Sequence, residues 1–156
     1  MNNIVNIELN NRKDYINKYN KKRISSDLDM YILNETKTVG LKDKIVIEIE
    51  TKLNLTKEEQ KELVAMIKLS YKDDLDELKI YEKKILEKAF ILLAIGVVIL
   101  IAYYLSNNLF FVSEFILIVG WLFIWEAFNG FIFSKTDNII KQIRRKQLIH
   151  SKILFK

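Results

Sequence analysis

Apolar side chains form one long block in the second half of the chain, and charged and polar side chains dominate on both sides of it. Within residues 89–133 only Glu114 and Glu126 ionise at neutral pH. A soluble helical pair of this composition would leave a large apolar surface in water. The pattern therefore predicts an integral membrane protein.

The block divides into two candidate spans. Residues 89–105 are seventeen uncharged residues, the lower limit for crossing about 30 Å of hydrocarbon as a helix. The second span covers about 110–133, and its helix begins near Leu109 or near Phe115. Ser106–Asn108 between them is polar and predicts a short turn. We expect a transmembrane helical hairpin.

Cations flank the block on both sides, and they predict its orientation. Six lysines precede it, at positions 68, 72, 79, 83, 84 and 88, and seven Lys and Arg residues follow it between 134 and 156. The turn has no cation nearby. Because Lys and Arg concentrate in cytoplasmic flanks, both ends of the chain are expected in the cytoplasm, in a multi-pass protein of the cell membrane.

The first half of the chain has the pattern of a small α/β domain. Ile4–Leu9 and Lys44–Glu50 are rich in β-branched residues and read as strands. Between them, Ser25 or Ser26 is suited to cap a helix, and Gly40 to end it. A strand, a helix and a strand in this order predict a parallel pair with a crossover helix.

A single long helix is expected to join this domain to the membrane. Thr56 and Glu59 form a capping box, and no glycine or proline follows before position 96. Apolar residues then recur at 63, 67, 71, 75, 78, 81 and 85, close to the helical period. The helix is predicted to run from about Lys57 to Leu105.

The predicted organisation has three parts: a cytosolic α/β domain over 1–88 that ends in the long helix, the hairpin over 89–133, and a basic cytosolic tail over 134–156. In the tail, Lys135–Gln147 continues as a helix, and Leu148–Phe155 is a candidate third strand. Two or three short strands are marginal alone, so we expect the chain to associate with itself.

The residue types give little support for catalysis. The chain has no cysteine, four glycines and one histidine, His150. This composition disfavours nucleophile pairs, metal clusters and phosphate-binding glycine loops, so no catalytic residue, metal or cofactor is predicted. The acidic run at 73–77 is interpreted as a solvated helix face. Residues 1–20 lack the apolar core of a secretion signal.

Glu126 is the most informative position, because an ionisable side chain in or near a membrane span usually has a partner or a role. With a tight turn it lies level with Lys88, and the two form an interfacial ion pair. With a later helix start it lies deeper, beside Asn129 at a helix interface. Glu114 is a further polar position in the block. Passage of ions or protons is a third interpretation.

Other residues in and after the second span have structural interpretations. Small residues, among them Gly96, Gly120 and Gly130, let helices approach one another, and Trp121 and Trp125 form a packing stripe. Cations predicted to meet anionic lipid headgroups are Lys135, Lys141, Arg144, Arg145 and Lys146. Such anchoring explains the basic cluster, so no nucleic acid partner is expected.

The layout resembles a family of small bacterial two-span membrane proteins of unknown function. The matching residues are Tyr31-Ile32, the Gly-Trp-x3-Trp motif of 120–125, and the closing segment 152–155. Where the family pattern continues with Arg-Pro, this chain has Glu126-Ala127. The resemblance implies a membrane location and no established activity.

Two functional hypotheses follow. The first is a non-enzymatic, self-associating membrane module whose cytosolic domain senses a ligand or recruits a protein partner. The second is a membrane-perturbing effector or pore of the defence or toxin type, in which several hairpins assemble and breach the bilayer. In both, the partners are the lipid bilayer and further copies of the chain.

Overall fold

The computed structural model describes residues 3–105 and 110–156, so the turn predicted at Ser106–Asn108 lies outside the described residues. The elements are β1 (Ile4–Leu9), α1 (Arg12–Tyr15), α2 (Ser26–Glu35), the 3₁₀ turn η1 (Thr36–Thr38), β2 (Val46–Thr51), α3 (Lys57–Leu105), α4 (Phe110–Asn129), the π-helical turn η2 (Gly130–Ser134), α5 (Lys135–Ile149) and β3 (Lys152–Phe155). They form a sheet unit, Met1–Glu77 with Gln142–Lys156, and a helix unit, Leu78–Lys141.

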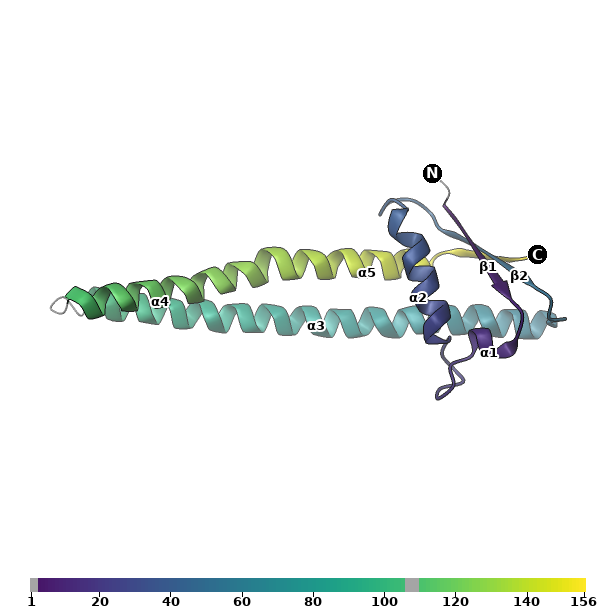
Figure 1. Ribbon diagram of the computed structural model, residues 1–156, viewed down its shortest axis with the longest axis horizontal. Coiled ribbons are helices and arrows are strands. Elements are labelled where there is room, and N and C mark those ends of the chain that lie inside the picture. The colour runs from purple at the N-terminus through teal and green to yellow at the C-terminus, as the bar shows by residue number, and fades with distance from the viewer. Residues whose placement is uncertain (1–2, 106–109) are drawn as a thin grey trace. The chain divides into compact units, whose positions relative to one another are not determined.

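The sheet unit contains three parallel strands in the order β1-β2-β3 (Figure 1). Val5 is the register partner of Ile47 on β2, and Ile47 is the partner of Ile153 on β3. The predicted parallel pair with a crossover helix is confirmed, and the C-terminal segment supplies the third strand. Segments from both ends of the chain therefore share one sheet.

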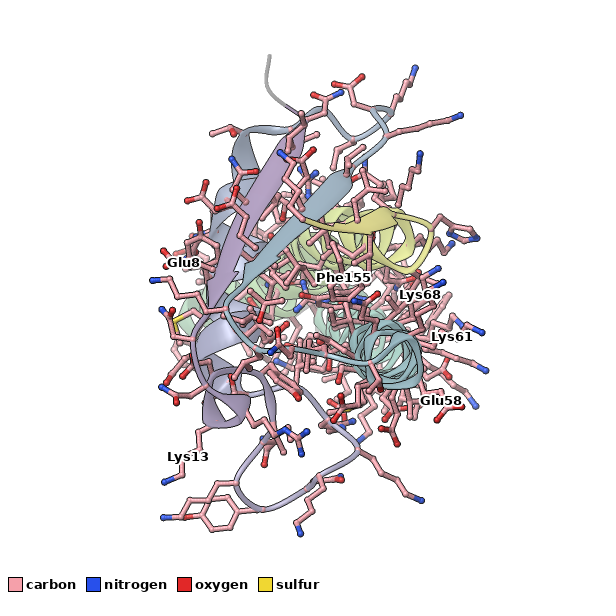
Figure 2. The ribbon with its side chains drawn as sticks, turned by 90° about the vertical axis from the view of Figure 1, so that its right-hand side faces the viewer. Glu8, Lys13, Glu58, Lys61, Lys68 and Phe155 are labelled. Carbon is pink, nitrogen blue, oxygen red and sulfur yellow. The ribbon has the colours of Figure 1, made fainter. Side chains whose placement is uncertain are left out.

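One face of the sheet carries the core. Alternate residues of β1 and β2 point into it and are at most 4% exposed, as the strand period requires. The helices contribute residues one turn apart, Leu28 and Ile32 from α2 and Leu63, Ile67 and Tyr71 from α3. Figure 2 shows the side chain of Glu8 on the other side of the sheet unit from Glu58 and Lys61 of α3.

The long helix has the predicted bounds, Lys57–Leu105. Its capping box is also as expected: the Glu59 amide donates to Thr56 Oγ1 at 3.2 Å, and the Thr56 amide donates to Glu59 Oε2 at 2.9 Å. Two N–H groups that a helix start leaves without partners are thereby satisfied.

Two predicted boundaries are wrong. The helix that starts after Ser25 ends at Glu35, well before Gly40, because the Thr36 hydroxyl bonds back to the Ile32 carbonyl oxygen at 2.9 Å and the chain tightens into η1. Leu148 belongs to α5 rather than to the third strand. It is fully buried, and a helix places its side chain in the core where a strand start would not.

In the helix unit, α3 and α4 run antiparallel, side by side (Figure 1). Both helices that contain the apolar block are long and apolar enough to cross a membrane. Only 17% and 11% of their most apolar windows are buried, unlike the core helix of a soluble protein. The described helices are therefore compatible with membrane spans.

Candidate functional site

The two apolar helices approach one another closely at glycines. A Cβ atom on Gly96 would lie 2.7 Å from Ile124 Cγ1 and 3.1 Å from the Gly120 carbonyl oxygen. A Cβ atom on Gly130 would lie 3.2 Å from Cβ of Ala89. Larger residues at these positions would force the backbones apart, so small residues determine how α3 and α4 pack.

Lys88 and Glu126 lie level with one another. Lys88 Nζ is 3.6 Å from Glu126 Oε1, the arrangement expected for a tight turn. The side chains are 70% and 52% exposed, so in water the pair would contribute little to stability. Because Glu126 lies at the edge of the apolar block, the main effect of the ion pair is to give its carboxylate a cation as partner.

The face of α4 that carries Trp121, Trp125 and Asn129 is exposed. The two tryptophans are 63% and 65% exposed. A cavity of about 250 Å³ lies on this face, lined by Trp121, Ile124, Trp125, Phe128, Asn129, Ile132 and Phe133. All these residues come from α4 and η2, and Asn129 contributes the single amide side chain. Glu114, nearer the start of α4, is also exposed.

The chain forms a π-helical turn directly after Asn129. In η2, Gly130–Ser134, each turn contains an extra residue, and the Lys135 amide donates to the carbonyl oxygens of Gly130 and Ile132. The Thr136 hydroxyl also donates to the carbonyl oxygen of Ile132. The sequence gives no signal for this turn, because its residues also fit an ordinary helix. Such turns often occur at functional positions.

The tail cations have several environments along α5. The cations predicted to contact lipid are Lys135, Lys141, Arg144, Arg145 and Lys146. Arg144 donates to the Val39 carbonyl oxygen at 2.7 Å, and Lys141 pairs with Asp137 at 2.7 Å. Lys146 is exposed. Contact with lipid headgroups stays a prediction for all five.

A polar cluster joins three helices of the sheet unit. Arg145 on α5 pairs with Asp74 on α3 at 3.1 Å, and its guanidinium lies 6.0 Å from the ring centre of Tyr71. The Arg145 and Asp74 side chains are only 18% and 26% exposed. Asp29 on α2 lies beside them, and Arg23 reaches the same region. We name Asp29, Tyr71, Asp74 and Arg145 the polar cluster.

Asp29 is the member of the polar cluster whose negative charge is least well compensated. Burial, and then the negative charge of Asp74, raise the pKa of Asp29 above its usual value, while Arg145, Tyr71 and Arg23 oppose the rise. Among the described residues, Asp29 Oδ1 and the Tyr71 hydroxyl are buried without a well-formed hydrogen bond. Burial is also the main cause of a strongly raised pKa at Tyr71.

We expect Asp29→Asn to stabilise the sheet unit at pH 7 by about 1 kcal/mol, the lower end of the cost of a buried, poorly paired group. Because the folded-state pKa is raised, the ionised carboxylate costs stability above that pKa, and the cost disappears when both states are protonated. The advantage of the variant should therefore vanish below about pH 4. Chemical denaturation of both proteins from pH 3 to pH 8 measures it. A constant difference across this range would contradict the explanation.

Sequence reasoning missed the polar cluster. The pattern of the acidic run at 73–77 favours a solvated face, whereas Asp74 pairs with Arg145 and Asp73 pairs with Arg23 at 3.1 Å. A usable signal is present, since Tyr71 and Asp74 lie three residues apart and share one face of α3 with the buried stripe.

The fold and the site define a class: a small parallel α/β unit followed by two long apolar helices that pack through glycines. Comparisons with protein-family models, curated proteins and solved structures found no match. The resemblance stated from the sequence is therefore matched in layout alone, as two apolar helices and a small parallel sheet.

Proposed function

We propose that this chain is a two-span membrane protein that associates with itself through the exposed face of α4 and has no enzymatic activity. Its sheet unit would lie in the cytoplasm and sense a ligand or recruit a partner. The observation that carries the proposal is the position of Asn129 among exposed aromatic residues on that face.

A membrane location accounts for the exposure of both apolar helices. The parallel pairing of β2 and β3 adds support for the topology, because hydrogen-bonded strands must lie on the same side of a bilayer. A chain that crosses the bilayer twice between β2 and β3 meets this condition. The cations that flank the apolar block favour the cytoplasmic side. A single Asn107→Cys label, reactive from outside the cell, tests the orientation in this cysteine-free chain.

Association follows from the chemistry of Asn129. An amide side chain in hydrocarbon stabilises a helix contact when it finds a hydrogen-bonding partner, and another copy of Asn129 is a matching donor and acceptor. Trp121 and Trp125, about two turns and one turn before Asn129 on the same helix, would supply packing area. The two helices of one copy leave this face uncovered, since its cavity is lined by α4 and η2 residues.

The test is the mass of the solubilised protein by light scattering, for the natural chain and for Asn129→Leu. We expect a defined oligomer that shifts toward the monomer in the variant. Leu122→Ala is the matched control, because Leu122 is also exposed, at 60%, but does not line the cavity. A monomeric natural chain would overturn self-association.

Cysteine cross-linking locates the interface. Asn129→Cys should form a disulfide between copies, and Leu122→Cys should not. Dye efflux from proteoliposomes then separates a module from a pore: rapid efflux by the natural chain would favour the membrane-perturbing hypothesis, and intact vesicles the module.

A further inference from the structure

The segment between α1 and α2 is a closed loop held by its own hydrogen bonds. Ile16 and Ile24 form an antiparallel bridge at its base, and the Asn17 amide donates to the Arg23 carbonyl oxygen at 3.0 Å. At the tip, Asn17 Oδ1 accepts from the amides of Tyr19 and Asn20 at 2.9 and 3.0 Å. The loop therefore has a defined backbone on which side chains can be positioned.

Contacts on both sides of the loop fix it to α3. Before the loop, Arg12 at the start of α1 pairs with Glu59. At the end of the loop, Arg23 pairs with Asp73 at 3.1 Å, and the Ile24 amide donates to the buried Ser70 hydroxyl at 3.2 Å. The loop is thus part of the sheet unit and moves with it.

The loop concentrates positive charge. Together with α1, which precedes it, the loop contains the cations Arg12, Lys13, Lys18, Lys21, Lys22 and Arg23. The one acidic residue among them, Asp14, accepts hydrogen bonds from the amides of Asn10 and Asn11 at 2.9 and 2.7 Å. These bonds orient the Asp14 carboxylate toward the start of α1. Among the described residues it forms no ion pair with a lysine of the loop, and cations outnumber acidic residues six to one between positions 12 and 23.

A cavity of about 510 Å³ lies beside four of these cations and is lined by Arg12, Lys13, Ile16, Asn17, Lys18 and Lys21. This volume is within the range of small-molecule sites. In the described part of the chain no carboxylate pairs with Lys13, Lys18 or Lys21. Figure 2 shows Lys13 on the other side of the sheet unit from Lys61 and Lys68 of α3. Like charges around one cavity repel unless an anion joins them.

We propose that this cavity, the loop pocket, binds a small ligand that carries two or more phosphate groups. Of the four lining cations, Arg12 pairs with Glu59, and Asp14 is the one acidic residue on the same segment. One phosphate monoester brings a charge of about −1.5 to −2 at neutral pH, so a ligand with two phosphates can pair with all four lining cations, and one phosphate with at most two of them. The Asn17 side chain adds a neutral hydrogen-bonding group, and Ile16 an apolar floor.

Such phosphates have two sources, a soluble nucleotide or a polyphosphorylated lipid headgroup. Tyr19 bears on this choice, because its side chain is 90% exposed and lies beside Lys18, whose Nζ is 5.6 Å from the ring centre. An exposed ring next to cations can stack on a base. The loop pocket gives a ligand class to the sensing role in the proposed function and rests on it in that respect.

The experiment is calorimetric titration of the detergent-solubilised full chain with sodium pyrophosphate, which tests the shared chemistry. We expect saturable binding that Lys18→Gln with Lys21→Gln weakens at least tenfold. Lys61→Gln with Lys68→Gln is the matched control, since it removes the same charge from α3 and should leave affinity within twofold. All four lysines have long side chains at the surface, so the fold tolerates these changes.

ATP and a soluble inositol bisphosphate headgroup then identify the source. Tighter binding of ATP than of pyrophosphate, reduced about fivefold by Tyr19→Ala, would assign a nucleotide. Tighter binding of the headgroup, unaffected by Tyr19→Ala, would assign a lipid. The proposal is overturned by absence of pyrophosphate binding at millimolar concentration, or by equal loss in the control pair. An oligonucleotide that binds where pyrophosphate does not would also overturn it. Self-association has no part in these titrations, so either proposal can fail alone.

Discussion

Replacing Arg145 by methionine is expected to destabilise the sheet unit by about 2 kcal/mol, because it leaves the Asp29 and Asp74 carboxylates facing one another without their cation. The Arg145 and Asp74 side chains are 18% and 26% exposed, so water screens them poorly. Methionine fills a similar volume over the Tyr71 ring, so the variant tests the loss of the Arg145 charge apart from a loss of packing. The cost is below that of a fully buried pair because part of the cluster meets solvent.

Hydrogen exchange of the β2 amides, followed by mass spectrometry, measures this loss. A change of about 2 kcal/mol corresponds to roughly thirtyfold faster exchange if these amides open with the whole unit. The double variant Asp74→Asn with Arg145→Met should recover much of the protection, since it removes the carboxylate as well as its partner. If Arg145 served lipid contact alone, exchange in β2 would not change.

Replacing Gly96 by leucine is expected to separate α3 from α4. Even a methyl group at this position would contact Ile124 Cγ1 at 2.7 Å and the Gly120 carbonyl oxygen at 3.1 Å, and the second contact is with backbone, which cannot rotate away. Overpacking of this kind typically costs about 1 to 3 kcal/mol, and more where two backbones meet.

Disulfide formation between Ala89→Cys and Gly130→Cys reports on this packing, because their Cβ atoms would lie 3.2 Å apart, so that a small shift of the helices reaches the disulfide range of about 3.5–4.5 Å. In the double cysteine variant that keeps Gly96, the two thiols should form a disulfide rapidly on oxidation. Gly96→Leu should slow this loss at least tenfold. Val97→Leu is the control, because Val97 is 43% exposed and lies next to Gly96. An equal rate in both variants would show that glycine is not needed at position 96.

The sequence predicted the elements that local pattern determines. The bounds of β1 and α3 agree with the structure, because an alternating β-branched run and a capping box followed by a helical stripe are strong local signals. The strand predicted at 44–50 is observed at Val46–Thr51. Ile45 is buried like the strand residues that follow it, but the residues of β2 that pair with β1 begin at Val46.

Other features depend on residues that are distant in sequence. The polar cluster combines Asp29, Tyr71 and Arg145 from three helices, and no spacing rule connects them. The short helix α1 and the bridge from Ile16 to Ile24 were not predicted, because four helical residues and one paired position leave no periodic signal. The loop pocket was missed for the same reason: its charges are visible in the sequence, but their convergence depends on the closed loop.

The position of β3 imposes an order on how the protein is made. The 100 residues between Thr51 and Lys152 include both apolar helices, and they are synthesised before β3 exists. Until then, one edge of β2 has no partner, so the sheet cannot be completed. If α3 and α4 span a membrane as proposed, completion also requires the segment after α4 to return to the side on which β1 and β2 lie. Under that proposal, a chain whose second apolar helix inserts wrongly would leave the edge of β2 unpaired and accessible to proteases, so completion of the sheet would depend on correct insertion of the helices that precede its last strand.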